Sequence, residues 1–179
     1  MLRHLTAVTA LALAVTGCAT MSVSSHVRGG IDFATYRTYD WGPADALPTG
    51  DPRLDQDPYF KDYLMGAVEK QLAARGYERS SSGTPDLLIH YHASITQRMN
   101  VYGVDREHGY CYDEDCKAWA TDYEAGTLVL DLVDARANQV IWRGWAQDSV
   151  EDLLDNGDRM ARKVREAVSR MLARLPPRL

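Results

Sequence analysis

The fold is constrained most strongly by two stretches in which the apolar residues all fall on one side of a helix. Apolar residues recur every four positions from Phe60 to Leu72, which predicts a helix with one apolar face over residues 57–75. Residues 157–175 repeat the pattern and end at a pair of prolines. Because a one-sided helix is stable only when another element covers its apolar face, both helices need a common surface on which to pack.

The first helix carries signals at both ends. Asp57 is a good N-cap residue and Pro58 suits the first helical position. Gly76 follows the last apolar residue and predicts the C-terminal cap. Residues 42–56, just before this helix, contain three prolines and two glycines and are predicted to form a loop.

Alternating or aromatic-rich runs predict the surface that the helices cover. Strands are expected at residues 21–27, 33–41 and 86–95, and as a hairpin of 127–134 and 139–147 around a polar turn at 135–138. Residues 99–124 are polar and aromatic without a clear period, and we expect them to be irregular.

The element order is therefore β-β-α-β-β-β-α, within a length of 179 residues that favours one domain. This order predicts an α+β two-layer sandwich, in which a mostly antiparallel sheet carries both amphipathic helices on one face. The other sheet face would meet solvent or a partner. Residues 31–176 form the predicted domain, and residues 18–30 form a tether that includes the first strand.

The N-terminal segment predicts export. Arg3 precedes an apolar run of eleven residues, Leu5 to Val15, which is too short to span a bilayer comfortably. The run ends in Val15-Thr16-Gly17-Cys18, which resembles the recognition site of bacterial lipoprotein signal peptidase. The resemblance implies removal of residues 1–17 and acylation of Cys18, whereas a plain secretory signal with an incidental cysteine is the alternative.

The residue after Cys18 is Ala19 rather than Asp, which in enterobacterial-type sorting implies transport to the outer membrane. The whole chain has 20 Lys and Arg against 25 Asp and Glu, and removal of residues 1–17 takes away one Arg. No basic tract interrupts this acidic composition. Binding to nucleic acid and attraction to anionic lipid headgroups are therefore both disfavoured.

Two cysteines remain after Cys18 is assigned to the lipid. Cys111 and Cys116 lie in a chain with an export signal, so we expect them to form a disulfide. Closing so short a loop contributes roughly 2 kcal/mol, less any strain, which suits a bond that fixes a loop.

Three segments resemble the bacterial lipoproteins that contain a DUF4136 domain. These segments are Phe33-x-x-Tyr36-x-Thr38-Tyr39-x-Trp41; Gly76-Tyr77 followed by Pro85-Asp86-Leu87-Leu88; and Gly126-Thr127-Leu128 through Asp131, Asp134 and Trp142-Arg143-Gly144. The resemblance spans residues 21–174 and implies a lipid-anchored envelope protein of unassigned biochemical function. It supplies no catalytic residues.

Few residues offer catalytic or metal chemistry. His90 and His92 lie two apart in a predicted strand, so both project to one face and could ligate a metal with acidic residues of the loop 105–116. Alternatively, they line the polar side of a half-exposed strand. Asp131 and Asp134 differ by three in a strand and point to opposite faces. From the sequence we expect neither a bound cofactor nor an enzymatic activity.

Two tryptophans of the predicted hairpin are expected on opposite sides of the sheet. Trp142 and Trp145 differ by three, so one joins the helix-covered core and the other lies on the open face with Arg143 and Gln147. An exposed aromatic residue beside Arg is typical of an interface hot spot. The alternative is that the second tryptophan packs beneath residues 99–124.

These patterns predict a lipid-anchored outer-membrane protein that faces the periplasm. It would act as a non-enzymatic module that binds an envelope protein through its open sheet face. Arg143, Trp145 and Gln147 are the candidate residues of this interaction surface. The alternative is a periplasmic module that binds a small ligand or metal with His90, His92 and the loop 105–116.

Overall fold

The computed structural model describes residues 21–43, 50–102, 119–151 and 153–178. The predicted signal peptide, the acylated Cys18, the Cys111–Cys116 disulfide and the whole loop 105–116 lie outside these ranges. Those expectations therefore remain predictions.

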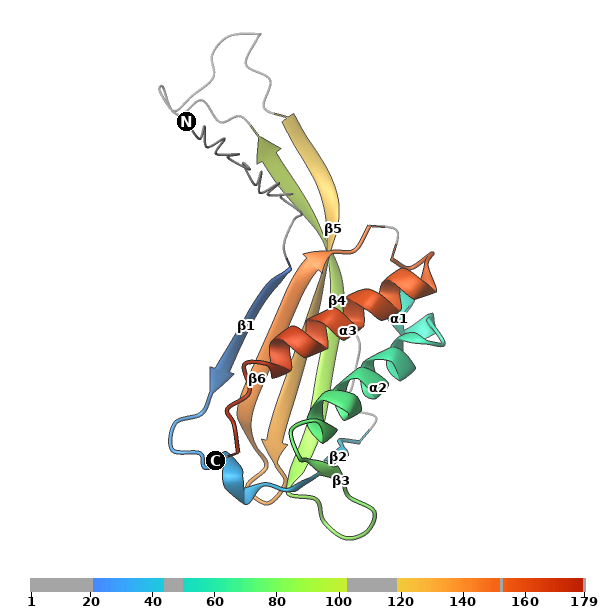
Figure 1. Ribbon diagram of the computed structural model, residues 1–179. Helices are drawn as coiled ribbons and strands as arrows, with labels where there is room; N and C mark the ends of the chain where they lie inside the picture. Colours follow the sequence, from blue (N-terminus) through green and yellow to red (C-terminus); the bar gives the residue numbers. More distant parts are fainter. Residues whose placement is uncertain (1–20, 44–49, 103–118, 152, 179) are drawn as a thin grey trace, which may run out of the picture.

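A single mixed sheet of six strands forms one layer, in the order β1-β6-β5-β4-β2-β3 (Figure 1). The strands are β1 (Ser22–Val27), β2 (Thr38–Trp41), β3 (Glu78–Arg79), β4 (Leu87–Tyr102), β5 (Trp119–Asp134) and β6 (Gln139–Ser149), and the α-helices are α1 (Pro52–Gln56), α2 (Phe60–Ala73) and α3 (Gly157–Leu172). The neighbours from β1 to β4 pair antiparallel, whereas β2 pairs parallel with β4 and with β3. The predicted α+β two-layer sandwich is confirmed.

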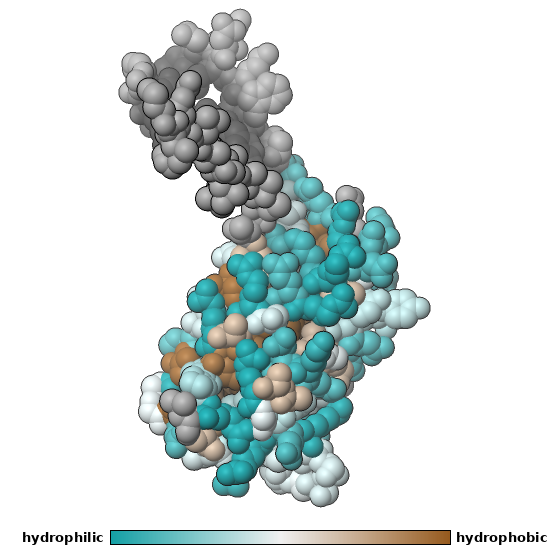
Figure 2. Space-filling view, in the orientation of Figure 1, coloured by the Kyte–Doolittle hydropathy of each residue, from teal (hydrophilic) through white to brown (hydrophobic). Residues whose placement is uncertain are grey.

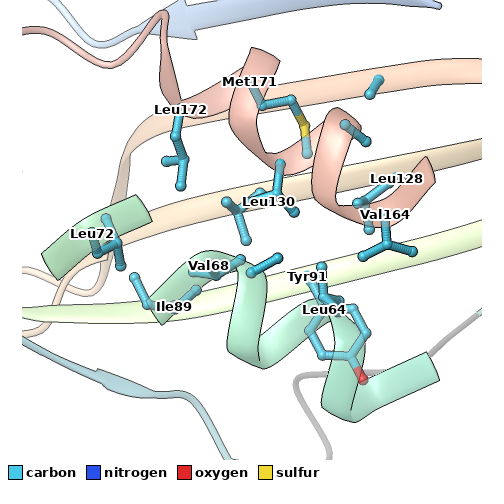
Figure 3. Packing of buried hydrophobic residues seen from close by; sticks show 14 of the residues in the cluster. Leu64, Val68, Leu72, Ile89, Tyr91, Leu128, Leu130, Val164, Met171 and Leu172 are labelled. Carbon is cyan, nitrogen blue, oxygen red and sulfur yellow. The ribbon is translucent and has the colours of Figure 1, made fainter. Parts of the chain in front are cut away.

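The long helices α2 and α3 lie across the same face of the sheet and form the second layer (Figure 1). Their apolar faces meet the inward side chains of β4 and β5 in one continuous core, part of which is shown in Figure 3. The residues labelled there are Leu64, Val68, Leu72, Ile89, Tyr91, Leu128, Leu130, Val164, Met171 and Leu172. This shared core is the surface that the two one-sided helices require.

The hairpin between β5 and β6 forms where the sequence predicts it. Asp134 Oδ1 accepts hydrogen bonds from the amides of Arg136 and Ala137 at 2.8 and 2.9 Å, and Asn138 adopts a positive φ of 51°. Asn tolerates this left-handed conformation better than most residues. A register shift next to Leu132 and Val133 then introduces a bulge into the pairing of the two strands.

Several residues that carry the family resemblance hold strand ends together. Asp86 Oδ2 accepts hydrogen bonds from the amides of Arg37 and Thr38 at 2.9 and 3.0 Å and from the Thr38 hydroxyl at 3.1 Å. These bonds, the Thr38 amide foremost, lower the pKa of Asp86. The Asp86 carboxylate thereby fixes the start of β2 beside the start of β4.

Tyr36 and Tyr77 have comparable structural roles. The Tyr36 hydroxyl donates to Asp134 Oδ2 at 2.8 Å, and burial together with this bond raises the pKa of Tyr36 to about 12. After α2, Gly76 has a φ of 77° and the Tyr77 amide donates to the carbonyl of Leu72 at 3.1 Å. This is the expected glycine cap, and it turns Tyr77 back into the core.

Two predicted segments differ from the structure before α2. The single strand expected over residues 33–41 is a 3-10 turn, Phe33–Thr35, followed by the four-residue β2. The Asp32 carboxylate starts this turn by accepting from the Ala34 amide at 3.0 Å. The predicted loop 42–56 also contains α1, because the carboxylate of Asp51 caps its first turn.

Further differences concern α2 and the long strands. The Asp57 carboxylate accepts from the amides of Tyr59 and Phe60, both at 2.8 Å, but regular helix begins only at Phe60. Within the predicted irregular segment 99–124, β4 continues to Tyr102 and β5 begins at Trp119, because the two strands pair along their whole length. The two-residue β3 was not predicted, since so short a strand has no sequence period.

Gly144 offers a direct test of how closely α3 packs on the sheet. A Cβ at Gly144 would overlap the Trp142 indole and would lie 3.2 Å from the Met171 Cβ. We therefore expect Gly144→Ala to lower the free energy of unfolding by about 1–3 kcal/mol through overpacking. Urea denaturation followed by circular dichroism measures the change.

Gly66, on the exposed side of α2, is the matched control. A Cβ there has no neighbour within 4 Å, so Gly66→Ala should raise the free energy of unfolding by about 1 kcal/mol through helix propensity alone. Equal effects of the two substitutions would contradict the close approach at Gly144.

Candidate functional site

The sheet face opposite α2 and α3 is the candidate site, and we call it the open face. Its central residues are Ser22, Ser24, His26, His90, His92, Ser94, Thr127, Val129, Asp131, Arg143, Trp145 and Gln147. Within the described residues, no helix covers this face. The strand register arranges these side chains in three parallel rows across β4, β5, β6 and β1.

The first row contains an ion pair between adjacent strands. Arg143 Nε and Nη2 donate to Asp131 Oδ1 and Oδ2, each at 2.6 Å. Asp131 is buried at 3% exposure, whereas the Arg143 side chain is about half exposed. The Asp131 carboxylate raises the pKa of Arg143. Arg143 is therefore a fixed, charge-compensated part of the surface, and one edge of its guanidinium is already occupied.

His90 lies at the other end of this row, opposite Asp131. A Cβ at Gly42 would overlap the His90 ring, so only glycine permits this close approach. His90 Nε2 is buried and has no hydrogen-bond partner among the described residues. Burial lowers the pKa of His90, while Asp131 partly opposes and His92 reinforces the shift.

The predicted metal site is incomplete in the described part of the chain. His90 and His92 do share the open face, as expected, but His90 Nε2 is covered whereas His92 is exposed. Across residues 21–43, 50–102, 119–151 and 153–178, no group of three or more His, Cys, Asp or Glu side chains could hold a metal ion. The acidic residues of the loop 105–116 lie outside these ranges.

Trp145 occupies the second row and is the large aromatic residue of the open face. It is 37% exposed, and the register places Val129 and Ser24 on its two sides and His92 beyond Val129. Trp142, by contrast, is fully buried. The two tryptophans therefore lie on opposite faces, as the sequence predicted, with Trp145 beside Arg143.

The third row contains Gln147, the remaining predicted surface residue. Gln147 Nε2 donates to Thr127 Oγ1 at 2.9 Å, and both side chains are half-buried. Arg143 and Gln147 lie on either side of Trp145 along β6, and each is held by a hydrogen bond to a side chain of β5. Such an arrangement presents one exposed aromatic ring within an ordered polar frame, which suits contact with a macromolecule.

The open face ends at an unpaired strand edge. In the described sheet, β1 is an edge strand that pairs only with β6. Its sequence, SVSSHV, lacks Pro, Lys, Arg, Asp and Glu, the residues that commonly protect such edges. A strand added to β1 would lie beside Ser24 and one strand away from Trp145, so the edge and the open face form one continuous surface.

A small apolar cavity lies on the other side of the sheet, beneath α3. It has a volume of about 80 Å³ and is lined mainly by apolar side chains, including Met21, Phe60, Leu128, Met160 and Val164. By comparison, an apolar cavity of roughly 150 Å³ admits benzene. Its size therefore suits a small apolar group and gives no support to a drug-sized ligand.

Within the described residues, none of the helices combines the length and the apolar character needed to cross a bilayer.

Comparison with known sequences identifies the family. Residues 23–177 match the family described as a domain of unknown function, DUF4136. The chain belongs to the DUF4136 family. The matched segment contains every residue of the three rows except Ser22. No curated protein matches the chain.

Two solved structures share the fold of this DUF4136 chain. A PDZ domain protein from Parabacteroides distasonis aligns with a TM-score of 0.56 at 18% identity, over 87% of this chain and 36% of its own. A PelC dodecamer from Paraburkholderia phytofirmans aligns with a TM-score of 0.52 at 10% identity, over 89% of this chain and 100% of its own. This chain therefore corresponds to about a third of the first protein and to all of the second.

The half-buried imidazole of His90 predicts a pH dependence of stability. Its pKa lies below the ordinary 6.5 in the folded protein, so the unfolded chain takes up the proton more readily. The free energy of unfolding should therefore decrease as the pH falls below 6.5, by at most about 1.4 kcal/mol per pH unit. Urea titrations between pH 5 and 7 measure this slope.

The three carboxyl groups with lowered pKa values, Asp51, Asp86 and Asp134, keep nearly all of their stabilising effect above about pH 5 and lose it progressively at lower pH. The slope above pH 5 should consequently diminish in His90→Gln and persist in His92→Gln, which replaces the exposed histidine of the same face. An unchanged slope in His90→Gln would show that His90 is not the group responsible.

Proposed function

We propose that this DUF4136 protein is a lipid-anchored, non-enzymatic binding module of the bacterial envelope. Acylated Cys18 would hold it at the outer membrane, with the domain facing the periplasm, and the open face would bind an envelope protein. The observation that carries this proposal is the continuity of the open face, with Trp145 at its centre, and the unpaired edge of β1.

This surface suits a protein partner for two physical reasons. Arg143 and Gln147 are already held by Asp131 and Thr127, so their ordering costs little conformational entropy on binding. Trp145 provides a rigid apolar contact, and the backbone of β1 can form hydrogen bonds with an extended segment of the partner. Another protein of this fold, PelC from Paraburkholderia phytofirmans, is solved as a dodecamer, so the fold is compatible with protein contacts in that case.

An enzymatic role receives less support from the same residues. The buried carboxylate of Asp131 is neutralised by a bidentate arginine, and the buried nitrogen of His90 is covered by Gly42. Neither group is available to a substrate. Ligand or metal binding through His90, His92 and the loop 105–116 would require His90 to turn away from Gly42.

The anchor is tested by Cys18→Ala. Without the thiol, no acyl chain can be attached, and we expect incorporation of a fatty-acid analogue to be lost and the protein to leave the membrane fraction. Metabolic labelling and fractionation of cells that express the full chain measure both effects. Retention of label or of membrane attachment in Cys18→Ala would refute the acylation site.

The binding surface is tested by photocrosslinking in living cells. A photoreactive amino acid at Ser24, His92 or Trp145 should yield one discrete protein adduct, identified by mass spectrometry, because these positions share the second row. The same amino acid at Lys61 or Lys70, which are exposed on α2, serves as the control on the opposite layer.

A Trp145→Ala substitution should reduce the adduct from Ser24 at least tenfold, since hot-spot tryptophans typically contribute 2 kcal/mol or more. Absence of an adduct from all three positions, or the same adduct from α2, would argue against the open face as the binding surface.

A further inference from the structure

The positive charge of the protein is concentrated at its C-terminal end. Residues 157–178 contain seven Lys and Arg against two Asp and Glu. Since the whole chain has 20 basic and 25 acidic residues, 13 basic and 23 acidic residues remain elsewhere. The basic residues are interspersed with apolar ones and therefore form no tract in the sequence, but one helix collects them.

The basic residues in and just after α3 lie on the outer surface of the helix layer. Arg162 and Arg165 of α3, and Arg174 after its end, are exposed and form no ion pair with the described residues. Hydrophilic side chains cover much of the helix layer in Figure 2. The opposite side of α3 is apolar and buried in the core. The helix therefore presents uncompensated positive charge to the outside.

The other basic residues in and after α3 are mostly engaged. Lys163 pairs with Asp148, Arg170 contacts Glu166 at 3.3 Å, and Arg178 donates to the carbonyl of Gly76. This leaves Arg162 and Arg165 of α3, together with Arg174 two residues after its end, as what we call the basic face of α3.

The start of the described fold lies next to this helix. Met21 is 5% exposed and lines the same small cavity as Met160 and Val164 of α3. Cys18 is three residues earlier, and three extended residues span at most about 11 Å. An acyl chain on Cys18 would therefore bring the bilayer surface close to the first half of α3.

We propose that the basic face of α3 binds the anionic headgroups of the phospholipid membrane that holds the anchor. The position of Met21 favours a membrane over an acidic protein, because the tether keeps this helix near the bilayer. The inference rests on the proposed acylation of Cys18. The acidic remainder of the chain does not prevent such contact, since charges act over a Debye length of about 8–10 Å.

This contact gives the two layers separate roles. With the helix layer turned toward the membrane, the open face on the opposite side of the sheet points away from it. Trp145 and the edge of β1 are then accessible to a protein partner.

Binding to vesicles tests the inference without the acyl chain. The chain that starts at residue 18 keeps the whole described core, which begins at Met21, and Cys18→Ser prevents acylation. We expect this protein to sediment with vesicles that contain about one third phosphatidylglycerol, and not with pure phosphatidylcholine. The binding should weaken as the salt concentration rises.

The decisive variant is Arg162→Gln/Arg165→Gln/Arg174→Gln, which should lower the partition coefficient roughly a hundredfold. Its control is Arg28→Gln/Arg37→Gln/Arg98→Gln, which removes the same charge from exposed positions outside α3 and should bind almost as the parent does. Equal binding to neutral and anionic vesicles, or equal losses in both variants, would overturn the inference.

The outcome is independent of the tests of the proposed function. The vesicle assay contains neither an acyl chain nor a protein partner, so its failure would leave the fatty-acid labelling and the crosslinks from the open face unchanged. Failure of those experiments would, conversely, not alter the binding measured with vesicles.

Discussion

The burial of one sheet face beneath α2 and α3 is the constraint on which the rest of the structure depends. Each helix is apolar on one side only, and neither apolar side could be covered without the inward residues of β4, β5 and β6. Close contact follows from this, since Gly144 lies where any side chain would meet Trp142 and Met171. Because the helices occupy one face, the other face of the same strands is left for interactions, and the alternation of β6 sends Trp142 inward and Trp145 outward.

Sequence patterns predicted this architecture because the patterns are periodic. The helical period from Phe60 to Leu72, the hairpin turn at 135–138 and the opposite orientations of the two tryptophans all follow from side-chain spacing. The segments that were wrong have no such period. α1 and the 3-10 turn depend on single aspartates that cap them, and the far ends of β4 and β5 are stabilised by pairing with each other rather than by a one-sided apolar pattern.

The candidate site was only partly predictable, because its key contacts depend on register. A regular hairpin that pairs Asp134 with Gln139 would place Asp131 opposite Trp142, whereas the bulge shifts the pairing by one residue and brings Asp131 opposite Arg143. The ion pair that fixes the surface around Trp145 therefore has no signature in residue spacing. The contact of Gly42 with His90 likewise joins residues far apart in the sequence. Some of the residues that carry the family resemblance, such as Tyr36, Thr38 and Asp86, are explained by hydrogen bonds that hold strand ends.

We therefore propose a different task for each layer, with the basic face of α3 turned to the membrane and the open sheet face available to a protein. Hydroxyl-radical footprinting tests the central claim, that the open face is occupied in the envelope, most directly. The oxidation of Trp145 would be compared in intact cells and in the purified protein, relative to Met99, which is 62% exposed on the opposite side of β4. We predict that Trp145 is protected several-fold in cells relative to Met99. Equal relative oxidation of Trp145 in cells and in the purified protein would contradict the account.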